Sequence, residues 1–189
     1  MNDPPAPELP APDRASLHEA ALRHLARYAT TRANLLRVLD RRIARWARAV
    51  HATDDAIATA RAAARAVVEA LAAAGAVSDA DFAAARARSL ARAGRSRQAI
   101  GAHLAARGVD AATRAAALPD DAASELAAAL LFLRRRRLGP YLRPGAVPPE
   151  RTRVMAALAR AGFPQHTARQ ALDMDPDTAE ALITALKHG

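Results

Sequence analysis

The stretch SRQAIGAHLAARGV at residues 96–109 carries the pattern that decides the fold. Ser96, a residue able to cap a helix, precedes an arginine, and apolar residues then follow at spacings of three and four up to Gly108. The same pattern occurs as TRANLLRVLDRRIA at residues 31–44 and as ERTRVMAALARAGF at residues 150–163. Repetition on this scale indicates one small helical unit used several times. We therefore expect function to lie in a surface that the units build together, and not in a single pocket.

Composition predicts an all-α fold. Hydrophobic residues make up 51% of the 189-residue chain, mainly as alanine, whereas aromatic residues make up only 3%. Alanine is the best helix former but contributes little apolar area when it is buried. No alternating run of β-branched residues is present. We therefore expect an elongated array of three tandem three-helix repeats with small cores, in which each short helix depends on its neighbours.

Capping residues, glycines and prolines divide the chain. Residues 1–15 are rich in proline and are predicted to form a disordered tail. The repeats are predicted at 16–77, with a long third helix, at 78–119, and at 120–189, with a C-terminal helix. Residues 16–19, SLHE, read as a capping box that begins the first helix. Two copies of the pattern depart from it, because Ile43 replaces glycine in the first copy and Glu150 replaces serine or threonine in the third.

Several classes of site are disfavoured by the residues present. The absence of cysteine excludes disulfides and thiolate metal sites and fits a reducing cytoplasm. The six histidines form no HExxH arrangement, and no glycine-rich phosphate loop occurs. The longest apolar stretch, residues 126–133, is far shorter than the ~20 residues of a membrane span, and no signal peptide is expected. We therefore expect a cytoplasmic monomer that is not an enzyme and uses no metal, cofactor or membrane.

The formal charge of +9 comes almost entirely from arginine. Such a surplus suggests nucleic acid or an acidic partner, although a genome rich in G and C would also favour arginine codons. Residues 86–107 contain six arginines and no acidic residue, and residues 134–137 are four consecutive arginines. Because aromatic residues are nearly absent from these stretches, base stacking is disfavoured. Two kinds of contact still fit these arginines: contact with a nucleic-acid backbone and contact with an acidic protein groove.

Three arginines begin their helices, where the partial positive charge of the free amides disfavours a cation by a few tenths of a kcal/mol. They are Arg32, Arg97 and Arg151. Helix stability does not explain them, so they either contact a partner or pair with an acidic residue on an adjacent helix. The full set of candidate binding residues is Arg32, Arg86, Arg88, Arg92, Arg95, Arg97, Arg134, Arg135, Arg136, Arg137 and Arg151.

The central block resembles the bacterial regulatory protein RecX family. The resemblance rests on the run SDADFA at residues 78–83, on Arg86 and Arg88, and on residues 94–109. Residues 22–39 are similar to the first repeat of that family, and residues 133–141 to its alphaproteobacterial members. The resemblance implies a curved body of three-helix repeats that lies in the groove of the RecA–DNA filament. It also implies a negative modulator that limits filament extension, recombination and co-protease activity, and thus a role in DNA repair and the SOS response.

Two other functions fit parts of the sequence. A general DNA-binding helical module would bind bare DNA with a steep dependence on salt, and equal affinity for bare DNA and for the filament would favour it. An enzyme acting on phosphate-containing substrates through the arginines would need a general base or a metal site. The sequence offers neither in a recognisable arrangement.

Overall fold

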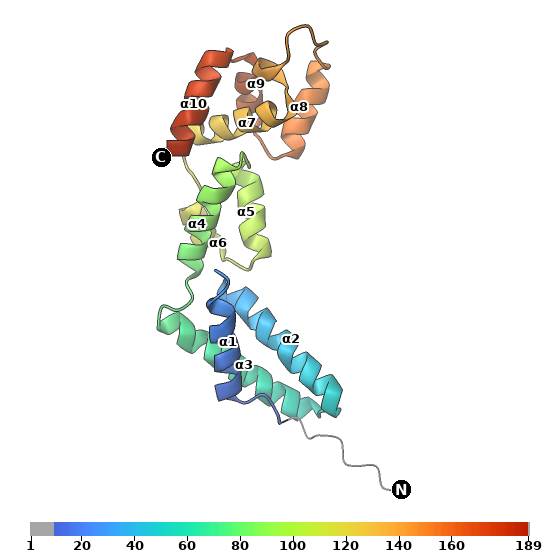
Figure 1. Ribbon diagram of the computed structural model, residues 1–189, viewed down its shortest axis with the longest axis vertical. Helices are drawn as coiled ribbons and strands as arrows, with labels where there is room; N and C mark the ends of the chain where they lie inside the picture. Colours follow the sequence, from blue (N-terminus) through green and yellow to red (C-terminus); the bar gives the residue numbers. More distant parts are fainter. Residues whose placement is uncertain (1–9, 189) are drawn as a thin grey trace. The chain divides into compact units, whose positions relative to one another are not determined.

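The computed structural model describes residues 10–188, which form ten α-helices and one short 3-10 helix (Figure 1). No strand occurs within this range, so the predicted all-α class is confirmed. The chain divides into two compact units. The first comprises the chain up to Phe82 together with Arg107–Val109, and the second comprises Ala83–Ala106 and the chain from Asp110 onward. The division into three repeats and their arrangement stay predictions.

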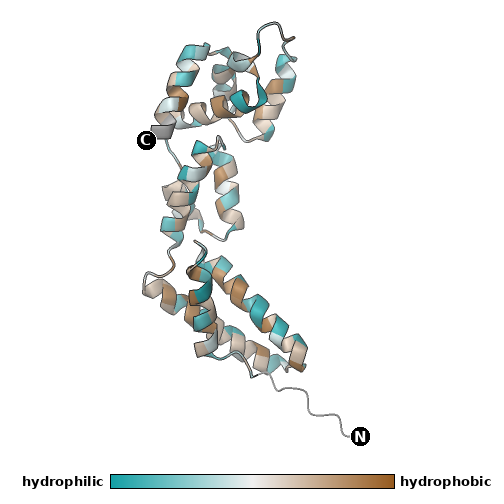
Figure 2. Cartoon of the chain, in the orientation of Figure 1, coloured by the Kyte–Doolittle hydropathy of each residue, from teal (hydrophilic) through white to brown (hydrophobic). Residues whose placement is uncertain are grey.

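The first unit is built around an amphipathic helix. Its three long helices are α1 (Arg14–Leu25), α2 (Arg32–Val50) and α3 (Asp54–Ala73). Hydrophobic and hydrophilic residues alternate along α2 (Figure 2). Leu35, Leu39 and Ile43 on its inner side are fully buried, which confirms the predicted stripe. Burial of each such side chain contributes about 1.5–3 kcal/mol, so this stripe holds α2 against the other two helices.

The start of the first helix in this unit differs from that predicted. The capping box at residues 16–19 is wrong, because the carboxylate of Asp13 accepts the N–H of Ser16 at 2.8 Å and α1 begins at Arg14. Helix α2 continues past Ile43 to Val50, because the first copy of the pattern has no glycine to end the helix at that position. Of the predicted tail, residues 1–9 lie outside the described residues.

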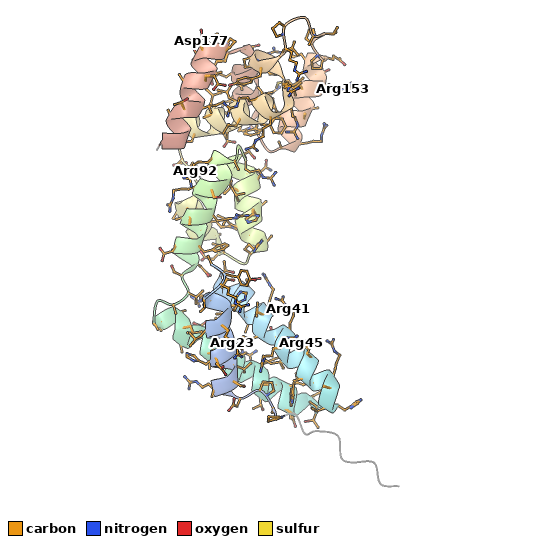
Figure 3. The ribbon with its side chains drawn as sticks, viewed as in Figure 1. Arg23, Arg41, Arg45, Arg92, Arg153 and Asp177 are labelled. Atoms are coloured by element: carbon orange, nitrogen blue, oxygen red, sulfur yellow. The ribbon has the colours of Figure 1, made fainter. Side chains whose placement is uncertain are left out.

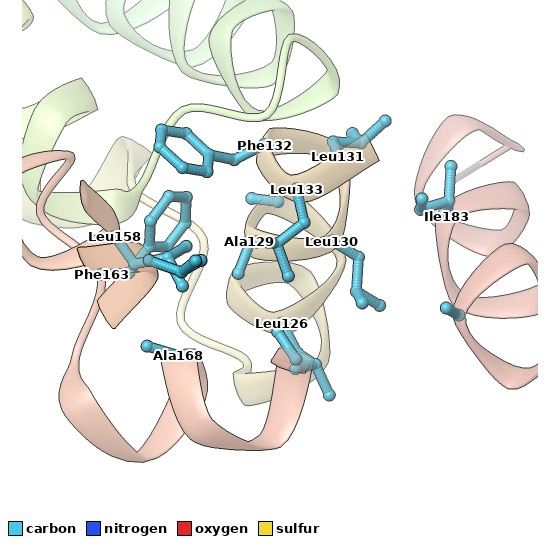
Figure 4. Close-up of a cluster of buried hydrophobic side chains, with 14 residues drawn as sticks. Leu126, Ala129, Leu130, Leu131, Phe132, Leu133, Leu158, Phe163, Ala168 and Ile183 are labelled. Atoms are coloured by element: carbon cyan, nitrogen blue, oxygen red, sulfur yellow. The ribbon is translucent and has the colours of Figure 1, made fainter. Parts of the chain in front are cut away.

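The second unit is built around a helix that is buried on most sides. Its helices are the greater part of α4 (Asp79–Arg92), α5 (Arg97–Ala106), α6 (Ala111–Ala117), α7 (Ala122–Arg136), α8 (Arg151–Arg160), α9 (Gln165–Asp173) and α10 (Pro176–His188), with the 3-10 helix η1 at Gly139–Tyr141. Every residue of α7 from Leu126 to Leu133 is buried (Figure 4). A helix that is apolar all round must be covered on all sides. Helices α9 and α10 pack against α7, and the Phe132 ring meets that of Phe163 edge to face at 5.7 Å.

Each unit contains one copy of the same polar joint. In the first unit the Thr31 hydroxyl accepts the N–H three residues on, and it donates to the carbonyl oxygen of Arg107 at 2.7 Å. In the second unit Ser96 does the same and donates to the carbonyl oxygen of Ala161 at 2.6 Å. Both Thr31 and Ser96 are fully buried. One hydroxyl thus satisfies a free amide at a helix start and a free carbonyl at a helix end.

A glycine follows each accepting carbonyl. Gly108 and Gly162 have φ angles of +83° and +86°, which few residues with a side chain adopt. There is also no room for a side chain at either position. A Cβ added at Gly108 would overlap the Cβ of Ala33, and one added at Gly162 would lie 2.7 Å from the hydroxyl oxygen of Ser96. The glycine is therefore part of the joint.

The joint explains why the first and third copies of the sequence pattern are incomplete. The first copy supplies the hydroxyl of Thr31, but Ile43 lies in mid-helix and forms no joint of this kind. The third copy supplies Gly162, but Glu150 makes no side-chain capping hydrogen bond. Only the middle copy, with Ser96 and Gly108, supplies both halves.

We predict that Gly108→Ala destabilises the protein more than Gly75→Ala. Gly75 has a φ of +73° with open space around it, so its replacement costs only the left-handed conformation, roughly 1–2 kcal/mol. Gly108→Ala adds the overlap with Ala33, worth about 1–3 kcal/mol more. Urea unfolding of the two variants measures the difference. Equal losses would show that the joint does not require a glycine for space.

Candidate functional site

The three arginines at helix starts are engaged within the fold. Each forms an ion pair with an acidic residue of a neighbouring segment, which confirms the pairing alternative. The pairs are Arg32–Glu69 at 3.0 Å, Arg97–Asp120 at 2.6 Å and Arg151–Asp173 at 2.7 Å. Exposed pairs of this kind contribute at most about 1 kcal/mol each. That is enough to offset a cation at a helix N-terminus, which costs a few tenths of a kcal/mol.

Two of these helix starts are also capped from a distance. The backbone N–H of Arg32 donates to the carboxylate of Asp79, and that of Arg97 donates to Glu125, both at 2.8 Å. Asp79 and Glu125 belong to the first turns of α4 and α7. Burial raises the pKa of Glu125, although the N–H and the charge of Arg97 act in the opposite direction. An acidic group thus lies at the helix start, where negative charge is favourable.

Two further candidates hold helices together. The Nε of Arg86 on α4 donates to Nε2 of His103 on α5 at 3.1 Å. Arg134 on α7 pairs with Glu180 on α10 at 3.0 Å. Arg137 ends α7 in the left-handed conformation, with a φ of +55°. Contacts inside the fold therefore account for the placement of Arg86 and Arg134.

Three of the remaining candidates meet at one pocket. Arg95, Arg135 and Arg136 line a cavity of about 230 Å³, whose other walls include Phe132 and Phe163. The guanidinium of Arg136 lies 3.8 Å from the centroid of the Phe132 ring, in a cation–π contact. Within residues 10–188, none of these three arginines has an acidic partner within ion-pair distance. We refer to this group as the arginine pocket.

The fold builds the arginine pocket from three segments that are far apart in sequence, and its arginines come from two of them. Arg95 lies directly before the buried cap Ser96, so the polar joint holds its backbone in place. Gly94, with a φ of +68°, lets that loop lie against α7, because a Cβ there would be 2.7 Å from the Cβ of Leu131. Arg135 and Arg136 lie in the last turn of α7, where the helix dipole favours cations.

The chemistry of the arginine pocket is that of an anion site. Guanidinium groups bind carboxylates and phosphates through paired hydrogen bonds, and charge-assisted bonds of this kind are the strongest available to side chains. Small-molecule sites usually have volumes of about 300–1,000 Å³. The 230 Å³ cavity is smaller, so it suits a single carboxylate or phosphate group presented by a larger partner.

The structure therefore separates the predicted arginines. It brings Arg95 together with Arg135 and Arg136, but Arg88 and Arg92 lie exposed on α4 and do not line this pocket. The two phenylalanines of the pocket wall were not predicted from the sequence. A set of exposed arginines on α2 was not predicted either, although their spacing along the helix places them on one face.

The described residues contain neither a metal-binding cluster nor a helix that could span a membrane. In the part of the chain that the structure describes, no three His, Asp or Glu side chains are grouped so that they could hold a metal ion. None of the described helices combines the length and the apolar character that crossing a membrane requires.

Comparison with known proteins identifies the family. A family model described as RecX, second three-helix domain, matches residues 78–118. The regulatory protein RecX of Myxococcus xanthus is 37% identical over 163 residues, which cover 85% of this chain and 86% of the relative. The chain belongs to the RecX family. The regulatory protein RecX of Agrobacterium fabrum is 30% identical over 109 residues, or 58% of each chain. No solved structure matches.

The matched domain contains residues that form the two polar joints and one arginine of the arginine pocket. Residues 78–118 include Arg95 of the arginine pocket, together with Ser96 and Gly108, which take part in the two joints. Both RecX relatives are named regulatory proteins. The family is thus one of regulators, and the central copy of the sequence pattern, at residues 96–109, lies in the part that the RecX model matches.

We predict that Arg151→Gln raises the pKa of the Asp173 carboxyl. The hydrogen bond from Arg151 is the main reason why that pKa lies below its usual range, so loss of this bond should return the pKa towards that of an ordinary aspartate. Asp175 is the control, because its pKa is lowered by Thr178 and not by an arginine. NMR titration of the carboxyl carbons measures both.

The same variant has a defined pH dependence. Because the pKa of Asp173 is lower in the folded state, the stability it contributes is present above its unfolded pKa and is lost as pH falls through the folded pKa. The stability difference between the natural protein and Arg151→Gln should therefore exist at neutral pH and vanish in acid. An unchanged Asp173 titration would show that Arg151 is free to contact a partner.

Proposed function

We propose that this protein is a negative modulator of the RecA recombinase. It binds in the groove of the RecA–DNA filament and limits filament extension, recombination and co-protease activity. Membership of the RecX family is the observation that carries the proposal. Regulation without catalysis fits the names of the relatives, and action on a filament assembled on chromosomal DNA implies a cytoplasmic protein of DNA repair and the SOS response.

The arginine pocket is the proposed point of contact with the filament. It combines three cations that lack acidic partners in the described structure with a volume suited to one carboxylate or phosphate group. A filament presents the same group once per protomer. A binder with more than one contact surface gains from this repetition, because each contact after the first is effectively intramolecular.

The candidate arginines differ in how available they are to a partner. Arg95, Arg135 and Arg136 come first, and the exposed Arg88 and Arg92 follow. The arginines already engaged in internal contacts come last, because a partner would have to replace an existing bond. These are Arg32, Arg86, Arg97, Arg134 and Arg151.

We predict that the triple variant Arg95→Glu, Arg135→Glu, Arg136→Glu loses the regulatory effect. Hydrogen bonds to charged groups contribute about 1.5–3 kcal/mol each, so loss of one or more should weaken binding at least about tenfold. Co-sedimentation with pre-formed RecA filaments measures binding, and inhibition of strand exchange measures the effect.

The matched control carries the same charge change at three exposed arginines that have no ion pair among the described residues. It is Arg153→Glu, Arg160→Glu, Arg169→Glu. The control should bind nearly as the natural protein does. If both triple variants lost binding equally, or if a folded pocket variant kept it, the pocket would not be the contact.

A further inference from the structure

One face of α2 carries a row of arginines that the proposed function does not use. The residues follow one another at spacings of four, four and three, so they share a face of the helix. All four are exposed, and Figure 3 labels two of them, Arg41 and Arg45. We call them the α2 arginine row: Arg37, Arg41, Arg45 and Arg48.

The position of this row on the first unit is fixed by packing. At 100° per residue, the row lies roughly opposite the stripe that buries Leu35, Leu39 and Ile43. The row therefore faces away from the core of its unit. Codon usage could account for the number of arginines in the chain, but it does not predict that four of them share one face of a single helix.

The fold leaves the charge of this row without a partner. Like charges at this spacing repel one another and destabilise a helix. Within residues 10–188 no member of the row forms an ion pair, whereas Arg23 and Arg32 of the same unit do. Asp40 is the one acidic residue of α2, and it lies about a quarter-turn away from the row. The row therefore adds nothing to the stability of the isolated unit.

The composition of the face indicates the class of its partner. Protein interfaces depend on buried aromatic or large apolar anchors. The exposed large apolar residues among those described are Leu22, Tyr28 and Val147, and none of them belongs to α2. A face with cations and no apolar anchor suits a partner whose contacts are purely ionic. A nucleic-acid backbone is such a partner, because phosphates recur along it at regular intervals.

The dimensions of the row fit the same partner. Arg37 to Arg48 spans 11 residues of helix, or about 16 Å, with neighbouring guanidinium groups rooted about 4–6 Å apart along the axis. The guanidinium fork matches the geometry of a phosphate group. Trp46 is the aromatic residue between Arg37 and Arg48, and it packs against the core of the unit, so the row offers no platform on which bases could stack.

We propose that the α2 arginine row binds the phosphodiester backbone of duplex DNA directly, as a surface additional to the arginine pocket. Binding is independent of base sequence and of any recombinase, and in that respect the inference goes beyond the proposed function. Each phosphate that the row neutralises adds about 0.9 to the slope of log K against log salt. Four contacts therefore add roughly 3.6.

The test uses the full chain and a labelled duplex of mixed sequence, with no recombinase present. Fluorescence anisotropy is measured between about 50 and 200 mM salt. The row variant is Arg37→Gln, Arg41→Gln, Arg45→Gln, Arg48→Gln. The control removes the same charge at exposed arginines elsewhere: Arg61→Gln, Arg153→Gln, Arg160→Gln, Arg169→Gln.

In the row variant, the slope of log K against log salt should become smaller in magnitude by roughly three to four, and binding at the lowest salt should be at least about tenfold weaker. In the control variant, the same slope should change by less than about one. Equal losses in the two variants, or no loss in the row variant, would overturn the inference. So would a row variant that loses poly-glutamate binding more than DNA binding, because the row would then recognise an acidic polypeptide.

Folding is checked by circular dichroism and by the unfolding midpoint, which should be unchanged or raised because repulsion is relieved. If the row variant does not fold, Arg41→Gln and Arg45→Gln are measured singly, and each should lower the slope by about 0.9. Failure here leaves the filament proposal intact, because that proposal depends on the arginine pocket and is measured with RecA present.

Discussion

The buried hydroxyl at the start of α2 and of α5 is the contact on which the local structure depends. Thr31 and Ser96 each accept from an amide of their own helix and donate to a carbonyl at the end of another. Without the hydroxyl, two buried polar groups would lose a partner, at a cost of about 1–3 kcal/mol each. The glycine that follows the carbonyl is required for the same approach. The sequence pattern thus recurs because its hydroxyl residue and its glycine form this joint.

The joint also determines what the neighbouring arginines do. The arginine directly after each hydroxyl begins a helix and is held by a nearby acid, as Arg97 is held by Asp120. The arginine directly before Ser96 turns instead towards the end of α7, where it meets Arg135 and Arg136. Two residues along the chain therefore separate Arg97, which is paired within the fold, from Arg95, which is available to a partner.

The same distinction applies across the whole charge surplus. A net charge of +9 does not by itself identify a binding surface, because some arginines neutralise acids within the fold. The arginine pocket and the α2 arginine row are distinguished by grouping, because each brings several arginines together to which the described structure gives no acidic partner. Unneutralised charge repels itself, so it is retained at no benefit to stability. Its natural complement is a polyanion or an acidic surface.

Much of the fold could be predicted because it is local. Helix caps, glycine stops and apolar stripes such as Leu35, Leu39 and Ile43 are visible within a few residues of sequence. The cap at Asp13 was missed because Ser16, three residues on, is an equally good cap by composition. The site was predicted only in part, because its contacts are remote. Arg32 pairs with Glu69, which is 37 residues further along the chain. The residues around Arg95 likewise give no signal that the end of α7 lies beside it.

Arginine footprinting on the filament shows whether the arginine pocket is the point of contact with RecA–DNA. A guanidinium-specific reagent is applied to the protein alone and bound to RecA–DNA filaments, and mass spectrometry reports the modification of each arginine. If the arginine pocket contacts the filament, Arg95, Arg135 and Arg136 become protected, while Arg151, already paired with Asp173, reacts equally in both samples. Protection of Arg151 with an unchanged pocket would contradict that contact.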